Sequence, residues 1–223
     1  MKKNLFLEAI TKFLLGVILV GLLIFLPAGT LHYSGGWTLM GILFVPMFCA
    51  GLMMLAKNPN LLKSRLAAKE KRAEQDKVVK LSGVMFIAGF VIAGLDFRFG
   101  WLPLPGWVRW VFTAAFLLAY LMYAEVLREN AYLSRTIEVQ ENQTVVSTGL
   151  YGIVRHPMYS ATLLLFLSMP LVMGSVLSLL CFLFYPVLIV KRLRDEETFL
   201  EQELPGYKEY KQKVKYRLIP GIW

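Results

Sequence analysis

A short polar cluster at residues 149–160 carries side chains that could bind a ligand. Pro157 disfavours helix at the residue before it and suits the first turn of a helix, so His156 is expected just ahead of a helix N-terminus. The free amide groups of that turn favour an anion, and Arg155 supplies a fixed positive charge. The cluster suits a nucleotide-like or amino-acid-like ligand, with an ordinary helix start at the lipid head-group level as the alternative. Flat faces and hydroxyl groups come from two tyrosines, Tyr151 and Tyr159.

A second polar cluster, residues 191–197, combines cations with two adjacent carboxylates, Glu196 and Glu197. On a helix, Arg192 and Glu196 are four residues apart and therefore face the same side. Such pairs are usually exposed and contribute only a few tenths of a kcal/mol, roughly, so a solvated helix end is the alternative. Two carboxylates this close to an apolar run could instead bind the ammonium group of a ligand.

An uncharged stretch, residues 158–190, joins the two clusters. A helix rises about 1.5 Å per residue, so about 20 apolar residues cross a bilayer core. Gly174 and Ser175 interrupt the stretch near its middle and predict a turn. A helical hairpin folded at this turn brings both clusters to the same side of a membrane, where two remote segments form one polar site.

The composition and the long apolar runs indicate an integral membrane protein. Hydrophobic residues make up 57% of the chain and charged residues 17%, whereas soluble domains carry about a quarter charged residues. We expect an all-α fold of about six transmembrane helices, divided into residues 1–127 with four spans and residues 128–223 with the hairpin and a polar tail that closes the site. The first four spans are predicted at residues 13–31, 37–56, 81–97 and 108–127.

The basic residues predict the orientation of these spans. With the N-terminus in the cytoplasm, 22 Lys and Arg residues fall in inner segments and only Arg98 and Arg109 in outer loops. This asymmetry places both termini and the polar site on the cytoplasmic side, which in a bacterium is the inner face of the inner membrane. It also explains the net charge of +9 without a nucleic-acid partner. Cys49 and Cys181 lie in apolar runs and form neither a disulfide framework nor a zinc spacing.

Three connecting segments have weaker patterns. Residues 57–80 mix both charge signs with apolar residues and predict a helix at the membrane surface. Residues 137–146 alternate at their start and predict a short hairpin or an extended loop. Residues 195–214 have a helical pattern that Pro205 and Gly206 interrupt.

An ordered set of short motifs resembles the isoprenylcysteine carboxyl methyltransferase family, which is related to the membrane phospholipid N-methyltransferases. The resemblance covers about residues 130–220, whereas the first three spans carry no recognised motif. The matching pieces are Arg-His-Pro-Met-Tyr at 155–159, the hairpin, Arg192-x-x-x-Glu196-Glu197, Tyr-Lys-Glu-Tyr at 207–210, Asn-Ala-Tyr-Leu-Ser at 130–134 and Arg-Leu-Ile-Pro at 217–220.

The resemblance implies S-adenosyl-L-methionine as the methyl donor and a lipidic or hydrophobic acceptor from the bilayer. No Gly-x-Gly-x-x-Gly fingerprint of the common soluble nucleotide fold is present. Arg192 and Glu197 match residues near the methyl-transfer centre and are the expected catalytic pair, with Arg192 holding a substrate carboxylate. The first cluster and the first glutamate supply the expected cofactor-binding residues: Tyr151, Arg155, His156, Pro157, Tyr159 and Glu196.

Other activities remain open at this point. A carboxylate acceptor needs no general base, as in isoprenylcysteine carboxyl O-methylation, whereas a phospholipid amine must first be neutral and Glu197 could remove its proton. The membrane sterol reductases share a similar hairpin and use NADPH. Their His-Pro-x-Tyr is followed by Gly-Glu, whereas Ser160 and Ala161 stand here. A non-catalytic membrane protein that retains the fold is the third alternative.

Overall fold

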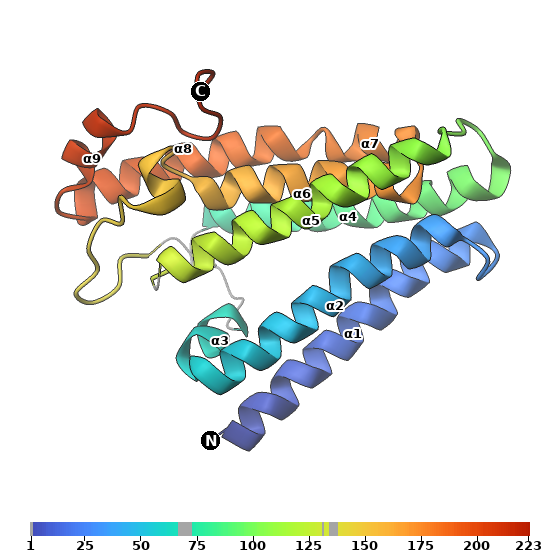
Figure 1. Cartoon of the computed structure of the whole chain (residues 1–223), viewed down its shortest axis with the longest axis horizontal. Helices are drawn as coiled ribbons and strands as arrows, with labels where there is room; N and C mark the ends of the chain where they lie inside the picture. Colours follow the sequence, from blue (N-terminus) through green and yellow to red (C-terminus); the bar gives the residue numbers. More distant parts are fainter. Residues whose placement is uncertain (1, 67–72, 131, 134–137) are drawn as a thin grey trace.

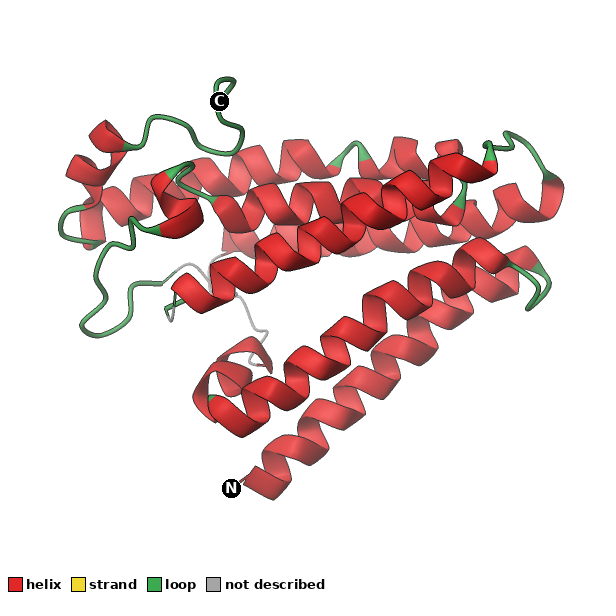
Figure 2. Cartoon of the chain, in the orientation of Figure 1, coloured by secondary structure: helices red, strands yellow, loops and turns green. Residues whose placement is uncertain are grey.

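The structure, a computed structural model, describes residues 2–66, 73–130, 132–133 and 138–223, and their regular secondary structure is helical (Figures 1 and 2). We call the end of the bundle with α3, η1 and α9 the inner end, and the opposite end the outer end. In chain order the elements are α1 (Lys2–Ala28), α2 (Ser34–Lys57), α3 (Pro59–Leu66), α4 (Ala73–Phe99), α5 (Gly106–Glu129), η1 (Gly149–Gly152), α6 (Pro157–Met173), α7 (Val176–Phe182), α8 (Tyr185–Glu203) and α9 (Tyr207–Lys213).

The helices are long and apolar enough for a membrane protein. The shorter α6 has 17 residues, which corresponds to roughly 25 Å. Together these elements confirm the expected all-α integral membrane fold. Five stretches meet the length and hydropathy of a membrane span: Asn4–Ala28, Ser34–Lys57, Asp76–Phe99, Gly106–Glu129 and Val176–Glu203.

The predicted hairpin forms the centre of the fold. Pro157 occupies the first turn of α6, and the helix ends at Gly174, whose φ of 84° is a left-handed conformation that glycine adopts without a steric penalty. Ser175 then caps α7 by accepting a hydrogen bond of 3.1 Å from the backbone N–H of Ser178. The chain returns through α7 and α8, so both polar clusters lie at the inner end (Figure 1).

Close packing joins the hairpin to the earlier helices. α6 packs along α5, and α7 packs against α4. Gly89 permits the second contact, because a Cβ there would lie 2.3 Å from the Phe182 ring. The predicted domain boundary at residue 127 lies near the end of α5, so α5 belongs to the N-terminal unit although it packs on α6. The division of the chain into two domains stays a prediction.

A buried polar network that the sequence did not reveal fixes the outer turn. Asp96 is 4% exposed and accepts hydrogen bonds from the Ser175 hydroxyl at 2.5 Å and the Leu102 N–H at 3.1 Å. The Tyr33 hydroxyl donates to the carbonyl oxygen of Met173 at 2.8 Å. These bonds tie α1–α2, α4 and the α6–α7 turn together, which holds the two arms of the hairpin in register.

The connecting segments follow their predictions in part. In the basic segment 57–80, α3 covers residues 59–66. The helix α4 begins at Ala73, ahead of the apolar span that was predicted from residue 81. The segment 138–146 is an extended loop with a turn near Asn142, and residue 137 lies outside the described residues. The tail forms two helices interrupted at Pro205 and Gly206, as predicted.

Candidate functional site

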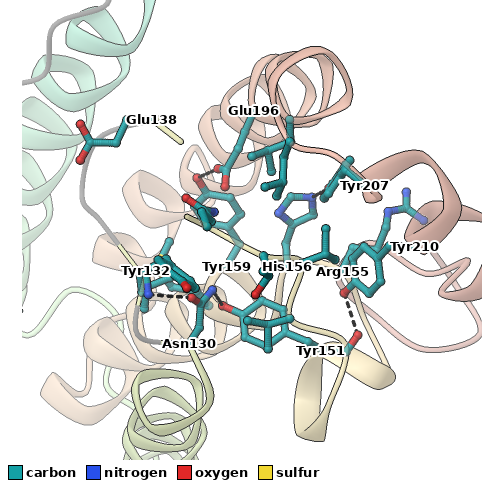
Figure 3. Close-up of a pocket in the computed structure, with 18 of the residues that line it drawn as sticks. Asn130, Tyr132, Glu138, Tyr151, Arg155, His156, Tyr159, Glu196, Tyr207 and Tyr210 are labelled. Atoms are coloured by element: carbon teal, nitrogen blue, oxygen red, sulfur yellow. Dashed lines mark hydrogen bonds between the residues drawn. The ribbon is translucent and has the colours of Figure 1, made fainter. Parts of the chain in front are cut away.

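A cavity lies at the inner end, where five segments meet (Figure 3). Its walls come from the residues just after α5, the loop 138–146, the stretch from η1 to the start of α6, the part of α8 from Arg192 onward and the segment around α9. Pro157 and Glu197, also predicted for the site, are buried and do not line it. Six of the eight predicted site residues line this cavity: Tyr151, Arg155, His156, Tyr159, Arg192 and Glu196.

The start of α6 is held by the C-terminal tail. His156 has non-helical dihedral angles immediately before Pro157, as the sequence predicted. Its backbone N–H donates to the carbonyl oxygen of Arg217 at 3.0 Å, and that of Arg155 donates to Tyr216 at 2.9 Å. The tail thus fixes the backbone that presents the first polar cluster to the cavity.

Glu197 is the centre of a buried ion cluster beside the cavity. It is 3% exposed and accepts from Arg155 Nε at 2.6 Å and from Arg217 Nε at 2.8 Å. The His156 Nε2 atom lies 3.3 Å from the same carboxylate. A buried carboxylate is tolerated only with such partners, because removing one strands an uncompensated charge. Glu197 therefore holds Arg155, His156 and Arg217 together beside the cavity.

The Arg155 guanidinium is also bound to the tail. Its Nη1 atom donates to the carbonyl oxygens of Val214 and Lys215, each at 2.8 Å, in addition to the bond to Glu197. Arg155 is 6% exposed. The charge of this arginine is therefore neutralised within the protein, although part of its side chain reaches the cavity wall.

A second polar chain runs across the cavity wall between α8 and α6. The Arg192 Nε atom donates to the Tyr159 hydroxyl oxygen at 3.0 Å, and that hydroxyl donates to Glu196 Oε2. The rings of His156 and Tyr159 are stacked, with centroids 5.8 Å apart. This arrangement presents the Glu196 carboxylate and the Arg192 guanidinium side by side at one wall, and Figure 3 shows Glu196 above the tyrosine ring.

Tyrosines form much of the remaining wall. Asn130 Nδ2 donates to the Tyr151 hydroxyl oxygen at 3.0 Å, and the Tyr210 hydroxyl donates to the carbonyl oxygen of Tyr151 at 2.7 Å. The Tyr207 hydroxyl lies 3.5 Å from His156 Nε2. Burial raises the pKa of Tyr151 to about 12, and it also raises the pKa of Tyr207 and of Tyr210. These phenols stay neutral near pH 7 and offer hydrogen bonds and aromatic faces.

The sequence reasoning did not assign some of the lining residues to the site. Tyr207 and Tyr210 lay within a recognised motif, and Asn130 and Tyr132 lay within another, so their sequence context was a usable signal. Glu138 lies on the loop and belongs to the cavity lining, and Figure 3 shows it to one side of the other labelled residues. No local pattern marks Glu138, because only the folded loop brings it there.

Comparisons with known proteins agree with the position of this cavity. Residues 107–205, less than half of the chain, match the family model of phospholipid methyltransferase. The matched region runs from α5 to the end of α8 and includes both polar clusters. The delta(14)-sterol reductase of Mus musculus is 32% identical over 91 residues, which cover 40% of this chain and 22% of that protein. Residues 107–205, which supply most of the cavity wall, are therefore similar to a membrane methyltransferase family, and 40% of the chain is similar to part of a sterol reductase.

Proposed function

We propose that the protein is an integral membrane methyltransferase that uses S-adenosyl-L-methionine and acts on a lipidic or hydrophobic acceptor, with a carboxylate as the preferred acceptor group. The match of residues 107–205 to phospholipid methyltransferase supports the reaction class. The spans support an acceptor that arrives from the bilayer, and the inner-end cavity supports a soluble cofactor that arrives from the adjacent water.

The charges of the cavity wall carry this proposal. Among the described lining residues, the ionised groups are two carboxylates, Glu138 and Glu196, and two guanidinium groups. One of these, Arg155, is already neutralised by Glu197 and two carbonyl oxygens. A dinucleotide phosphate brings several negative charges, which proteins usually bind with several cations. A sulfonium cofactor carries positive charge, which suits carboxylates and aromatic faces.

The residues present fit such a cofactor. Glu196 and the tyrosine faces are the groups that would hold its positive charges, with Asn130 and His156 as further polar contacts at the wall. When bound, the cofactor supplies a methyl group on a positively charged sulfur. The cavity residues exclude water and hold the reacting groups in position, which are the main contributions a protein can make to this transfer.

We assign Arg192 to the acceptor. Its guanidinium group is oriented by Tyr159 and adjoins Glu196, so a carboxylate bound by Arg192 lies beside the proposed cofactor site. The planar fork of arginine matches a carboxylate in a bidentate geometry. A new oxygen–carbon bond forms as the sulfur–carbon bond breaks, giving a methyl ester and a neutral thioether, and no proton has to move.

Glu197 acts on the site through its neighbours. The sequence predicted it in the catalytic pair, a role that stays a prediction. Its contacts to Arg155, Arg217 and His156 lead us to propose that it positions these residues and does not touch the substrate. Because Glu197 is paired with Arg155 and Arg217, it is poorly placed to take a proton from a phospholipid amine, which favours the carboxylate acceptor over the amine.

An NADPH-dependent reductase is the second candidate. The 32% identity to the Mus musculus sterol reductase favours it, and the shared stretch covers 40% of this chain. The described lining residues include only two arginines, Arg155 and Arg192, and Arg155 is already bound to Glu197, which argues against a ligand with several phosphates.

Calorimetry on the purified protein in detergent separates the two candidates. We expect S-adenosyl-L-methionine to bind at one site per chain and NADPH not to bind. Glu196→Gln should weaken binding by about tenfold, as expected for loss of one charge-assisted contact. Glu201→Gln is the matched control, since Glu201 lies on the same helix but pairs with Lys211 outside this cavity. Binding of NADPH with no binding of the sulfonium would contradict the proposal.

A further inference from the structure

Arg65 lies in a defined position at the inner end of the bundle. It belongs to the last turn of α3, where it donates a hydrogen bond to the Tyr123 hydroxyl on α5. Its guanidinium carbon lies 5.5 Å from the centroid of the same tyrosine ring, a distance typical of a cation–π contact. The arginine is half-buried and is therefore oriented by the protein.

Three further contacts hold α3 in place. Asn58 caps the helix by accepting a 3.1 Å hydrogen bond from the N–H of Leu61. Leu62 is only 4% exposed and anchors the helix against the bundle. The Lys12 ammonium group donates to the carbonyl oxygen of Leu66 at 3.0 Å, which ties the end of α3 to α1. A short helix held at both ends gives Arg65 a fixed place near the membrane surface.

Arg65 contacts the helix that leads to the cavity, because α5 carries Tyr123 and is followed directly by Asn130, which lines the cavity and donates to the Tyr151 hydroxyl. The charge of Arg65 acts on the Tyr151 hydroxyl, opposing the rise in pKa that burial causes, and Tyr151 lines the cavity. The inner end of the bundle therefore carries two oriented guanidinium groups, Arg192 at the cavity wall and Arg65 on α3.

We infer that Arg65 binds the anionic head group, a phosphate or a carboxylate, of a lipid at the inner membrane surface and so guides that lipid to the mouth of the cavity. The guanidinium fork matches both anions. Arg65 lies near the inner end of the α5 span, at the depth where arginine side chains reach the lipid head groups. The identification of the bound lipid with the methyl acceptor rests on the proposed function. The binding of the head group to Arg65 is independent of the proposed function, because this binding can be measured without turnover.

Native mass spectrometry of the detergent-solubilised protein tests the inference. The probes are a phosphatidylglycerol and a phosphatidylcholine with the same acyl chains. We expect the wild type to retain the phosphatidylglycerol preferentially and Arg65→Gln to lose about tenfold in that preference, as for one charge-assisted contact. Arg65→Lys should keep part of the preference. Arg128→Gln is the matched control, since Arg128 is an exposed arginine at the same end of α5 that pairs with Glu125.

The competing explanation is that Arg65 only latches α3 to α5. In that case Arg65→Gln and Tyr123→Phe lower the melting temperature by similar amounts and leave the lipid preference unchanged, a result that overturns the inference. Displacement of the lipid by millimolar inorganic phosphate would also overturn it, because the site would then take any anion. If Arg65→Gln does not fold, Arg65→Lys provides the test. An unchanged preference for phosphatidylglycerol and an unchanged response of that preference to salt in Arg65→Lys would also contradict lipid binding by the guanidinium group.

The two proposals fail separately. If the preference depends on Arg65 but S-adenosyl-L-methionine does not bind, the proposed function is wrong and the lipid site stands. If S-adenosyl-L-methionine binds and the preference is independent of Arg65, the lipid site is wrong and the proposed function stands.

Discussion

Two adjacent carboxylates have different surroundings at the inner end of α8. Successive residues of a helix point about 100° apart, so Glu196 faces the cavity while Glu197 faces the tail. Their partners differ accordingly, with Glu196 accepting from a tyrosine hydroxyl and Glu197 from two arginines. We therefore assign the same chemical group to binding at one position and to folding at the next.

Exchanging each glutamate for glutamine tests this difference. Glu197→Gln leaves Arg155 and Arg217 without their anion, and we expect it to lower the free energy of unfolding by about 3 kcal/mol. Glu196→Gln should leave the stability close to wild type and weaken cofactor binding. Denaturant unfolding in detergent measures the first effect and calorimetry the second. A stable Glu197→Gln paired with an unfolded Glu196→Gln would reverse the two assignments.

Arg192 is the residue that we expect to control turnover. Arg192→Ala should lower kcat/KM for a carboxylate acceptor by about 100-fold, which corresponds to two charge-assisted hydrogen bonds, and Arg192→Lys should not restore it. Because a carboxylate acceptor is already ionised, the rate of methyl transfer should change little between about pH 6 and pH 8. A rate that rises steeply over this interval would instead indicate an amine acceptor, which must lose a proton first.

At the scale of the elements, residues 214–223 of the C-terminal tail position the site, and none of them is among the residues that line the cavity. Arg217 joins the tail to Glu197 on α8, and its guanidinium group lies 5.2 Å from the centroid of the Trp223 ring. The Ser160 hydroxyl donates to the carbonyl oxygen of Leu218 at 2.6 Å, which adds a bond to α6. The first cluster therefore depends on backbone contacts from about sixty residues further along the chain.

Arg217→Gln tests the contribution of the tail. We expect cofactor affinity to fall by about tenfold, because the loss of one charged contact loosens the support of Arg155 and His156. Lys213→Gln is a control, since Lys213 is exposed at the end of α9. Calorimetry measures both, and equal affinities for the two variants would show that the tail does not support the site.

Local signals explain which elements the sequence predicted. Pro157 before an apolar run, Gly174 at the turn and Pro205-Gly206 in the tail each act on the adjacent backbone, and all three marked boundaries that the structure confirms. Contacts between distant residues leave no such trace. The burial of Asp96 under Ser175 and the approach of Glu138 to the cavity depend on the folded arrangement, and a single sequence contains neither.

For the whole molecule, the distribution of charge predicts the orientation in the membrane. The 22 basic residues of the inner segments against two in the outer loops predict that the cavity opens to the cytoplasm. Reporter fusions truncated after Leu31 and after Leu104, in the two outer loops, should give an external signal. Fusions after Asn58 should give an internal signal, and the reverse pattern would place the cavity on the other side of the membrane.

The central claim is methyl transfer to a membrane acceptor, and a single assay tests it most directly. The protein in nanodiscs is given S-adenosyl-L-methionine with a labelled methyl group and, in parallel, a prenylcysteine analogue, a phosphatidylethanolamine and a hydrophobic thiol. We predict a base-labile methyl ester on the prenylcysteine analogue that is lost in Arg192→Ala. No labelled product from any acceptor, together with oxidation of NADPH by a sterol, would contradict the account.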